Sequence, residues 1–125
     1  MATKNWELEV EKKWFDAIKS GDKKWEGRRF ISINKFTPDH TVTFFHTNGG
    51  VRIEEVSKKI VEMRWFKDYE DALKTLPLRD VLPGVVATAT QTVEKVGEEI
   101  YMSYNRGNPR KMEELLLGVC FIRLE

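Results

Sequence analysis

The sequence predicts one small α+β domain, a closed or nearly closed barrel of mixed strands with helices at its ends. Its 125 residues leave no room for two independent hydrophobic cores, so we expect a single domain over residues 1–125. Patterns typical of strands and helices alternate along the chain, in the order strand, helix, several strands, two or three helices, strand. The final strand is apolar enough to be central, which indicates that it returns to the core.

The N-terminal segment predicts a strand followed by a short helix. Residues 6–11 alternate between apolar side chains and glutamates, which is typical of a half-buried strand. Residues 14–18 carry Trp, Phe and Ile at helical spacing, and Ser20 with Gly21 supplies a helix stop.

The middle of the chain predicts strands. The segment "RRFISI" (28–33) alternates, and "TVTFF" (41–45) is rich in β-branched and aromatic residues. After a glycine turn, residues 51–66 predict one long or bent strand, or two strands. Their alternation breaks near Glu54 and Glu55, so we expect a bulge or bend there.

The C-terminal half predicts helices and a closing strand. Asp68 is a plausible N-cap for a helix that Pro77 ends. Residues 88–105 place apolar and tyrosine side chains on one helical face, with Gly97 as a weak point inside the helix. Residues 115–125, "LLLGVCFIRLE", predict the last strand.

Composition excludes several classes of protein and site. The single Cys120 excludes an internal disulfide and a cysteine-built zinc site, and its apolar neighbours favour a buried structural thiol. His40 and His46 have no partner at metal-site spacing, so we expect no metal, and nothing in the sequence requires a cofactor. No signal peptide and no stretch of ~18 apolar residues is present, which indicates a protein of the cytosol or nucleus with no membrane association.

The net charge is only +1, from 21 Lys and Arg against 20 Asp and Glu. Many nucleic-acid binders are strongly basic, so an RNA-binding role would require the positive charge to gather on one face.

One charged segment is a candidate for such a face. Residues 21–28 fit the pattern Gly-x-Lys-x-x-Glu-x-Arg. If residues 25–29 form a strand, Glu26 and Arg28 share one face and Trp25 points to the core. Lys23 would carry a flexible ammonium that can reach a phosphate, and Arg28 a planar fork suited to a phosphate or a base edge.

Two interpretations of this segment remain open on the residues alone. Glu26 could accept hydrogen bonds from an exocyclic amine or hold Arg28 in place, while Arg29 and Lys24 add to the local positive field. Alternatively, the charged side chains form an ordinary surface ion-pair ladder that adds little stability.

A second basic group follows the last long helix. Arg106, Arg110 and Lys111 lie near Tyr104 in a loop, a combination suited to the backbone of single-stranded RNA. Solvated loop charge explains the same residues equally well.

The residues also allow a catalytic interpretation. Metal-free RNA cleavage needs a base and a cation, and Glu26 could be the base with Lys23 and Arg28 as cations. Tyr104 or Tyr69 could donate a proton. No spacing singles out such a site, which favours a binding module.

Several segments, taken in order, resemble the ASCH family of the PUA-like superfamily. They are the motif at residues 21–28, the preceding helix "WFDAIKSG", the run "MRWFKDYEDALKTLPLRDVLPG" and the closing "LLGVCFIRL". The resemblance implies a barrel of five to six mixed strands flanked by short helices, with a cleft lined partly by the motif. It also implies RNA-related work, which in some branches is ribonuclease action or hydrolysis of acetylated cytidine.

The chain departs from the hydrolase branch at one position. That branch has a Thr nucleophile where this chain has Glu26, although Lys23 is present, and a carboxylate does not replace a hydroxyl in acyl transfer. We therefore expect a monomeric protein that binds RNA or a nucleotide in a cleft beside the motif. The alternatives are a hydrolase (a metal-independent ribonuclease or a modified-nucleoside amidohydrolase) and a protein-interaction platform.

The candidate residues follow from these hypotheses. The expected ligand-binding residues are Lys23, Glu26, Arg28, Arg29, Arg106 and Arg110, and the expected catalytic residues are Lys23, Glu26 and Tyr104.

Overall fold

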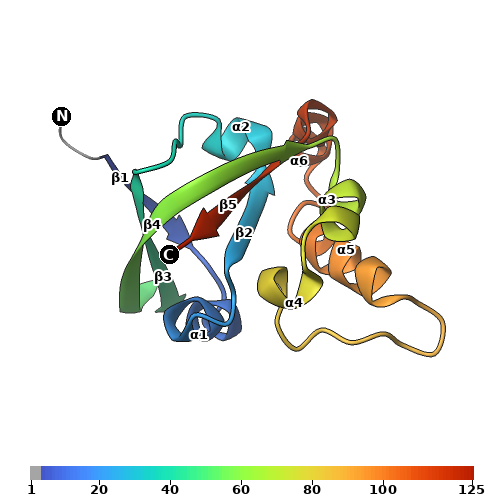
Figure 1. Cartoon of the computed structure of the whole chain (residues 1–125), viewed down its shortest axis with the longest axis horizontal. Helices are drawn as coiled ribbons and strands as arrows, with labels where there is room; N and C mark the ends of the chain where they lie inside the picture. The colour runs from blue at the N-terminus through green and yellow to red at the C-terminus, as the bar shows by residue number, and fades with distance from the viewer. Residues whose placement is uncertain (1–3) are drawn as a thin grey trace.

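The computed structural model describes residues 4–125 and has an α+β fold, with a five-stranded mixed sheet and several short helices (Figure 1). The strands are β1 (Asn5–Glu9), β2 (Trp25–Arg29), β3 (Thr41–Asn48), β4 (Val51–Phe66) and β5 (Val119–Leu124). The helices are α1 (Lys12–Ser20), α2 (Phe30–Ile33), α3 (Tyr69–Thr75), α4 (Leu78–Val81), α5 (Val93–Ser103) and α6 (Pro109–Glu114), and a 3-10 turn follows at Leu115–Leu117. No helix in the described residues is long and apolar enough to cross a membrane.

The long strand β4 holds the sheet together. The strand order is β1-β3-β4-β5-β2, with β1 and β3 parallel and the other pairs antiparallel. The first half of β4 pairs with β3 and the second half with β5. The pairing register of β4 shifts twice. The first shift is against β3, where Glu54 pairs with His46 and Arg52 with Thr47, so that Ile53 has no partner residue. The second is against β5, between Ile60 and Glu62. The bend expected near Glu54 therefore lies within one residue of the first shift.

The predicted closed barrel is not confirmed. The strands β1 and β2 are the two edges of the sheet, and no described strand pairing joins them. One side chain bridges the opening instead, because Arg28 Nη2 donates to the backbone oxygen of Glu9 at 2.8 Å. Closure depends on pairing between strands far apart in sequence, which local periodicity does not report.

Local signals at helix ends are confirmed. α1 ends at Gly21, whose φ of 88° is the left-handed conformation that glycine adopts without a Cβ penalty. Asp68 caps α3 by accepting a hydrogen bond from the backbone nitrogen of Asp71.

Three expectations for local structure are wrong. Residues 115–117 form a 3-10 turn rather than the start of the last strand, because β5 begins only at Val119. Arg110 and Lys111 lie in the helix α6 rather than in a loop. The alternation in residues 28–33 predicted a strand, but β2 ends at Arg29 and α2 follows, which buries Ile33 completely. Gly97 lies inside α5, which is continuous from Val93 to Ser103. A Cβ there would lie 3.1 Å from Leu82 Cδ1 and 3.2 Å from Leu73 Cδ1, so the glycine allows α5 to pack closely against its neighbours.

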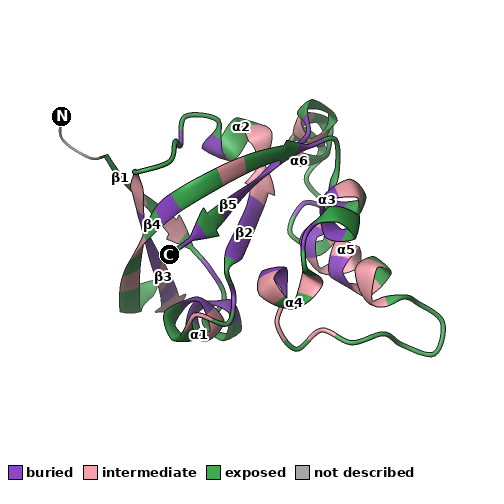
Figure 2. Cartoon of the chain, viewed as in Figure 1, coloured by how far each residue is buried: buried purple, intermediate pink, exposed green. Residues whose placement is uncertain are grey.

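The core fills the space between the sheet and the helices (Figure 2). Trp25 lies in it, as its parity in the strand predicted. Cys120 is buried there too, and this burial raises the pKa of its thiol. Among the buried residues are also two charged ones from the motif, Lys23 and Glu26.

Candidate functional site

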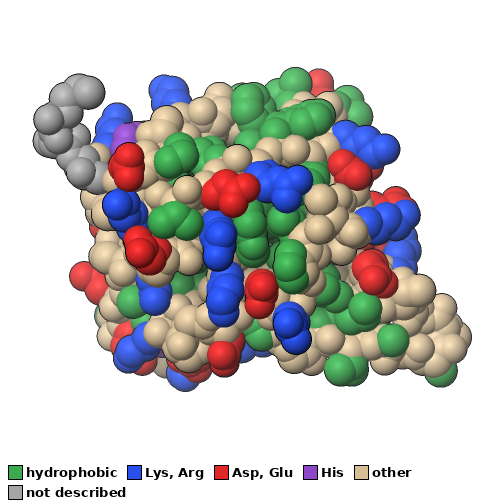
Figure 3. Space-filling view, viewed as in Figure 1, with side chains coloured by type: hydrophobic (Ala, Val, Ile, Leu, Met, Phe, Trp, Pro, Cys, Tyr) green, Lys and Arg blue, Asp and Glu red, His purple; other side chains and the backbone are tan. Residues whose placement is uncertain are grey.

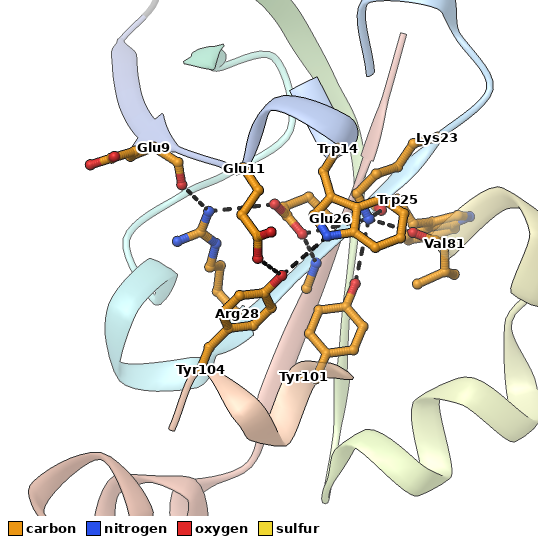
Figure 4. Close-up of polar contacts among 11 residues, drawn as sticks. Glu9, Glu11, Trp14, Lys23, Trp25, Glu26, Arg28, Val81, Tyr101 and Tyr104 are labelled. Atoms are coloured by element: carbon orange, nitrogen blue, oxygen red, sulfur yellow. Dashed lines mark hydrogen bonds and ion pairs between the residues drawn. The ribbon is translucent and has the colours of Figure 1, made fainter. Parts of the chain in front are cut away.

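A cavity of about 650 Å³ lies at the opening between the two edge strands. Its walls come from the end of β1 (residues 9–11), from β2 (residues 26–29) and from the C-terminal end of α5 (residues 101–105). The motif therefore lines a cavity beside the two edge strands of the sheet. Figure 4 shows the polar side chains that meet there.

Lys23 is buried at the back of this cavity, with only 2 % of its surface exposed. Its ammonium donates to the backbone oxygens of Trp25, at 2.8 Å, and of Val81, and it lies 3.5 Å from the hydroxyl of Tyr101 (Figure 4). These three acceptors account for its three N–H groups. The expectation of a flexible ammonium that reaches a phosphate is therefore wrong: this lysine is held in place.

Glu26 lies between two cations. Its Oε1 is 3.7 Å from the ammonium of Lys23, and its Oε2 is 3.4 Å from Arg28 Nη2. Oε1 also accepts a hydrogen bond from the backbone nitrogen of Gly27 at 2.9 Å. Because Glu26 is only 5 % exposed, this group is not the surface ion-pair ladder considered above. The expectation that Glu26 and Arg28 share one face is confirmed.

Arg28 is the most accessible member of the motif's charged group. Its side chain is 30 % exposed, and its Nη2 is used by Glu26 and by the backbone oxygen of Glu9. Its Nη1 and Nε make no hydrogen bond to any residue in the described range 4–125. The guanidinium therefore lines the cavity with donors that remain free for a ligand.

All three tyrosines of the chain line the cavity. The rings of Tyr69 and Tyr101 stack with centroids 4.7 Å apart and an interplanar angle of 9°. The hydroxyl of Tyr104 accepts from Trp14 Nε1 at 3.1 Å and donates to Glu11. Tyr101 in α5 and Tyr104 at its C-cap are three residues apart, so they lie on the same side of the helix.

Burial perturbs the titration of these groups. It raises the pKa of Tyr69 to about 12 and that of Tyr101 well above its usual value. Burial and the hydrogen bond to Glu11 raise the pKa of Tyr104 to about 12. Burial lowers the pKa of Lys23, and the neighbouring Glu26 opposes part of that effect.

Alkaline titration of the tyrosine hydroxyls tests whether these side chains are buried in the cavity. We expect the folded protein to form little phenolate at pH ~10, where free tyrosine is half ionised, and the urea-unfolded protein to titrate normally there. The folded state then keeps protons that the unfolded state releases, so stability falls as the pH rises above ~10. Near-ultraviolet absorbance of phenolate measures this directly. One tyrosine in three ionising normally in the folded protein would contradict the buried geometry.

Sequence reasoning missed several residues of the site. The sequence pattern predicts that Glu9 and Glu11 lie on the polar face of a strand. It predicts that Trp14 lies on the apolar face of a helix. The helical pattern predicts that Tyr101 and Tyr104 share one helix face. Because Tyr104 was a candidate site residue, this shared face was the feature of the sequence that could have identified Tyr101. The contact between Trp14 and Tyr104 joins positions 90 residues apart, which no local pattern reports.

The other predicted basic residues lie differently. Arg29 lines the cavity but pairs with Glu114 at 3.0 Å. Arg106 pairs with Glu99, and Arg110 with Glu114 at 3.1 Å, and neither lines this cavity. Their roles in RNA binding stay predictions. Within the described residues, no three His, Cys, Asp or Glu side chains converge as the ligands of a metal ion would.

Comparison with known proteins gives structural relatives only. Neither a protein-family model nor a curated protein matches the sequence. The solved hypothetical protein PH0355 is 23 % identical, with a TM-score of 0.71 over 97 % of both chains. Protein PF0455 from Pyrococcus furiosus is 20 % identical, with a TM-score of 0.63 over 97 % of this chain and 96 % of the other.

An ASCH protein from Zymomonas mobilis is also similar. It is 15 % identical, with a TM-score of 0.61, over 98 % of this chain and 67 % of the other. At these identities the likeness concerns the fold. This structural similarity shows that the chain has an ASCH-type fold.

Proposed function

We propose that this protein binds RNA or a nucleotide in the cavity beside the motif. The observation that carries the proposal is the convergence of Arg28, Glu26 and Tyr104 on one hollow of about 650 Å³. That volume lies within the usual range of small-molecule sites, ~300–1,000 Å³.

The distribution of charge supports an anionic ligand. Five basic side chains line the cavity, and three acidic ones do. The basic residues are Lys12, Lys23, Arg28, Arg29 and Lys111, and the acidic residues are Glu9, Glu11 and Glu26. The whole chain has a net charge of only +1, so this small region has a larger positive excess than the entire protein. Such an excess attracts phosphate groups.

The chemistry of the lining suits a nucleotide. The free Nη1 and Nε of Arg28 can donate to a phosphate or to the acceptors of a base edge. The neighbouring carboxylate of Glu26 supplies an acceptor beside those donors, and base edges carry donors and acceptors side by side. Lys23 contributes through its field rather than by contact, because backbone oxygens occupy its ammonium.

The test is the effect of Arg28→Gln on RNA affinity. With labelled single-stranded RNA and fluorescence anisotropy at several salt concentrations, we expect the variant to bind about tenfold more weakly at low salt. The slope of log affinity against log salt should fall by about 0.7, because one phosphate contact is lost.

A matched control variant distinguishes the loss of the Arg28 contact from the loss of one positive charge anywhere on the protein. Arg79 is exposed, makes no ion pair within residues 4–125 and does not line the cavity, so Arg79→Gln removes the same charge elsewhere. Equal losses in both variants, or no RNA affinity of the unmodified protein at low salt, would refute the proposal.

A second candidate function is hydrolysis of RNA or a modified nucleoside. The observation that favours it is a buried lysine of lowered pKa beside a carboxylate and a tyrosine hydroxyl, since such perturbed groups cluster at catalytic sites. The RNA from the binding experiment distinguishes the two functions. Intact RNA on a denaturing gel supports binding alone, whereas shortened products that disappear with Glu26→Gln support the hydrolase.

A further inference from the structure

A second, smaller concavity of about 250 Å³ lies near the C-terminal end of β5. Three cations line it: Lys24 just before β2, Lys58 on β4 and Arg123 on β5. Figure 3 shows Lys and Arg side chains gathered over the end of β5 and the start of β2. The buried Lys23 borders both this concavity and the larger cavity.

We propose that this concavity binds a phosphate group. None of the three cations makes an ion pair with a carboxylate anywhere in the described residues 4–125. By contrast, the adjacent Lys59 pairs with Asp39 at 3.4 Å. Three unpaired cations around one small hollow repel one another, and a bound dianion relieves that repulsion.

The backbone holds this site in position. The nitrogen of Lys24 donates to the backbone oxygen of Asp80 at 2.6 Å, and the nitrogen of Leu124 donates to the oxygen of Lys24 at 2.8 Å. The nitrogen of Glu125 donates to the oxygen of Lys59 at 3.0 Å. These bonds tie the lysine to β5, and β5 to β4. The backbone positions from which these side chains project are therefore fixed relative to one another.

The nearby acidic groups leave a positive excess. Glu125 is the acidic side chain in the lining, and Glu62 lies across the strand pair from Arg123. Four basic residues line the hollow against this one glutamate. A guanidinium together with ammonium groups is the combination that phosphate oxygens prefer.

The phosphate has two possible sources, a free or nucleotide phosphate and the backbone of RNA. The segment that contributes Lys24 here contributes Arg28 to the larger cavity four residues later, a distance of ~13 Å along an extended strand. One RNA strand could therefore engage both sites. The phosphate site itself does not depend on the function proposed for the larger cavity.

The test begins with inorganic phosphate. Backbone amide NMR of the whole protein, titrated with sodium phosphate at constant ionic strength, should show saturable shifts around Lys24, Lys58 and Arg123. The Lys58→Gln, Arg123→Gln double variant should bind phosphate at least tenfold more weakly. Lys59→Gln, a neighbour that is already ion-paired, should bind as the unmodified protein does. Shifts that do not saturate, or an equal loss with Lys59→Gln, would overturn the proposal.

A second arm identifies the source. If RNA supplies the phosphate, the double variant also weakens binding of single-stranded RNA and lowers the salt slope by about 1.4, for two lost contacts. If RNA affinity is unchanged while phosphate binding is lost, the ligand is a free or nucleotide phosphate. Arg28→Gln should leave the phosphate-induced shifts around Lys24, Lys58 and Arg123 unchanged, because Arg28 does not line this concavity. Failure of the larger cavity as an RNA site and failure of this site are therefore distinguishable.

Discussion

Replacing Lys23 with methionine is expected to lower the free energy of unfolding by about 3–5 kcal/mol, because it removes one partner of a buried ion pair. The backbone oxygens of Trp25 and Val81 would lose their buried donor. Glu26 would keep only Arg28 as a nearby cation. Urea unfolding followed by circular dichroism measures the change.

Lys24→Met is the matched control for this prediction. The adjacent lysine is exposed, so the same substitution there should change stability by no more than about 0.5 kcal/mol. In the double variant Lys23→Met, Glu26→Gln, part of the loss should be recovered, since the carboxylate no longer lies buried without its partner. Equal costs at the two lysines would show that Lys23 is solvated.

Gly27→Ala is expected to destabilise the fold by about 3 kcal/mol through overpacking. A Cβ at this position would overlap the ring of Phe121 on the neighbouring strand β5. That ring is fully buried and packs edge-on against Tyr101 and Phe66, with centroids 5.5 and 5.9 Å apart, so it has little room to move. Thermal and urea unfolding both measure the effect.

A second substitution separates overpacking from backbone effects. Phe121→Leu shortens the side chain that the new methyl group meets, so the Gly27→Ala, Phe121→Leu double variant should lose less stability than the two single variants together. Strict additivity would show that the ring is not what excludes a side chain at Gly27. Because Gly27 lines the cavity between Glu26 and Arg28, a shift of its backbone should also weaken RNA binding.

Features set by neighbouring residues were predictable from the sequence. The stop at Gly21, the cap at Asp68 and the burial of Trp25 follow from patterns within a few positions, and the structure confirms them. The ASCH-type fold was predictable for a related reason, because its segments occur in a fixed order along the chain.

Short sequence patterns gave wrong predictions where a helix and a strand are both compatible with the same residues. Residues 30–33 carry apolar side chains three positions apart as well as an alternation, so a helical turn and a strand explain them equally well. Gly97 has a low helix propensity, but its close contact with Leu82 depends on how α4 meets α5.

By itself, the sequence determined the order of the elements apart from α2 and α6, the motif, and the shared face of Glu26 and Arg28. These features depend on spacing along the chain. Only the tertiary structure decided what that face meets. The buried ammonium of Lys23 donates to the backbone oxygen of Val81, 58 residues later. Residues at the end of β1 and in β2, the two unpaired edge strands, line the cavity. The two-residue repeat of a strand shows which side chains point in the same direction. Burial and cavities depend instead on which distant segments pack against those side chains.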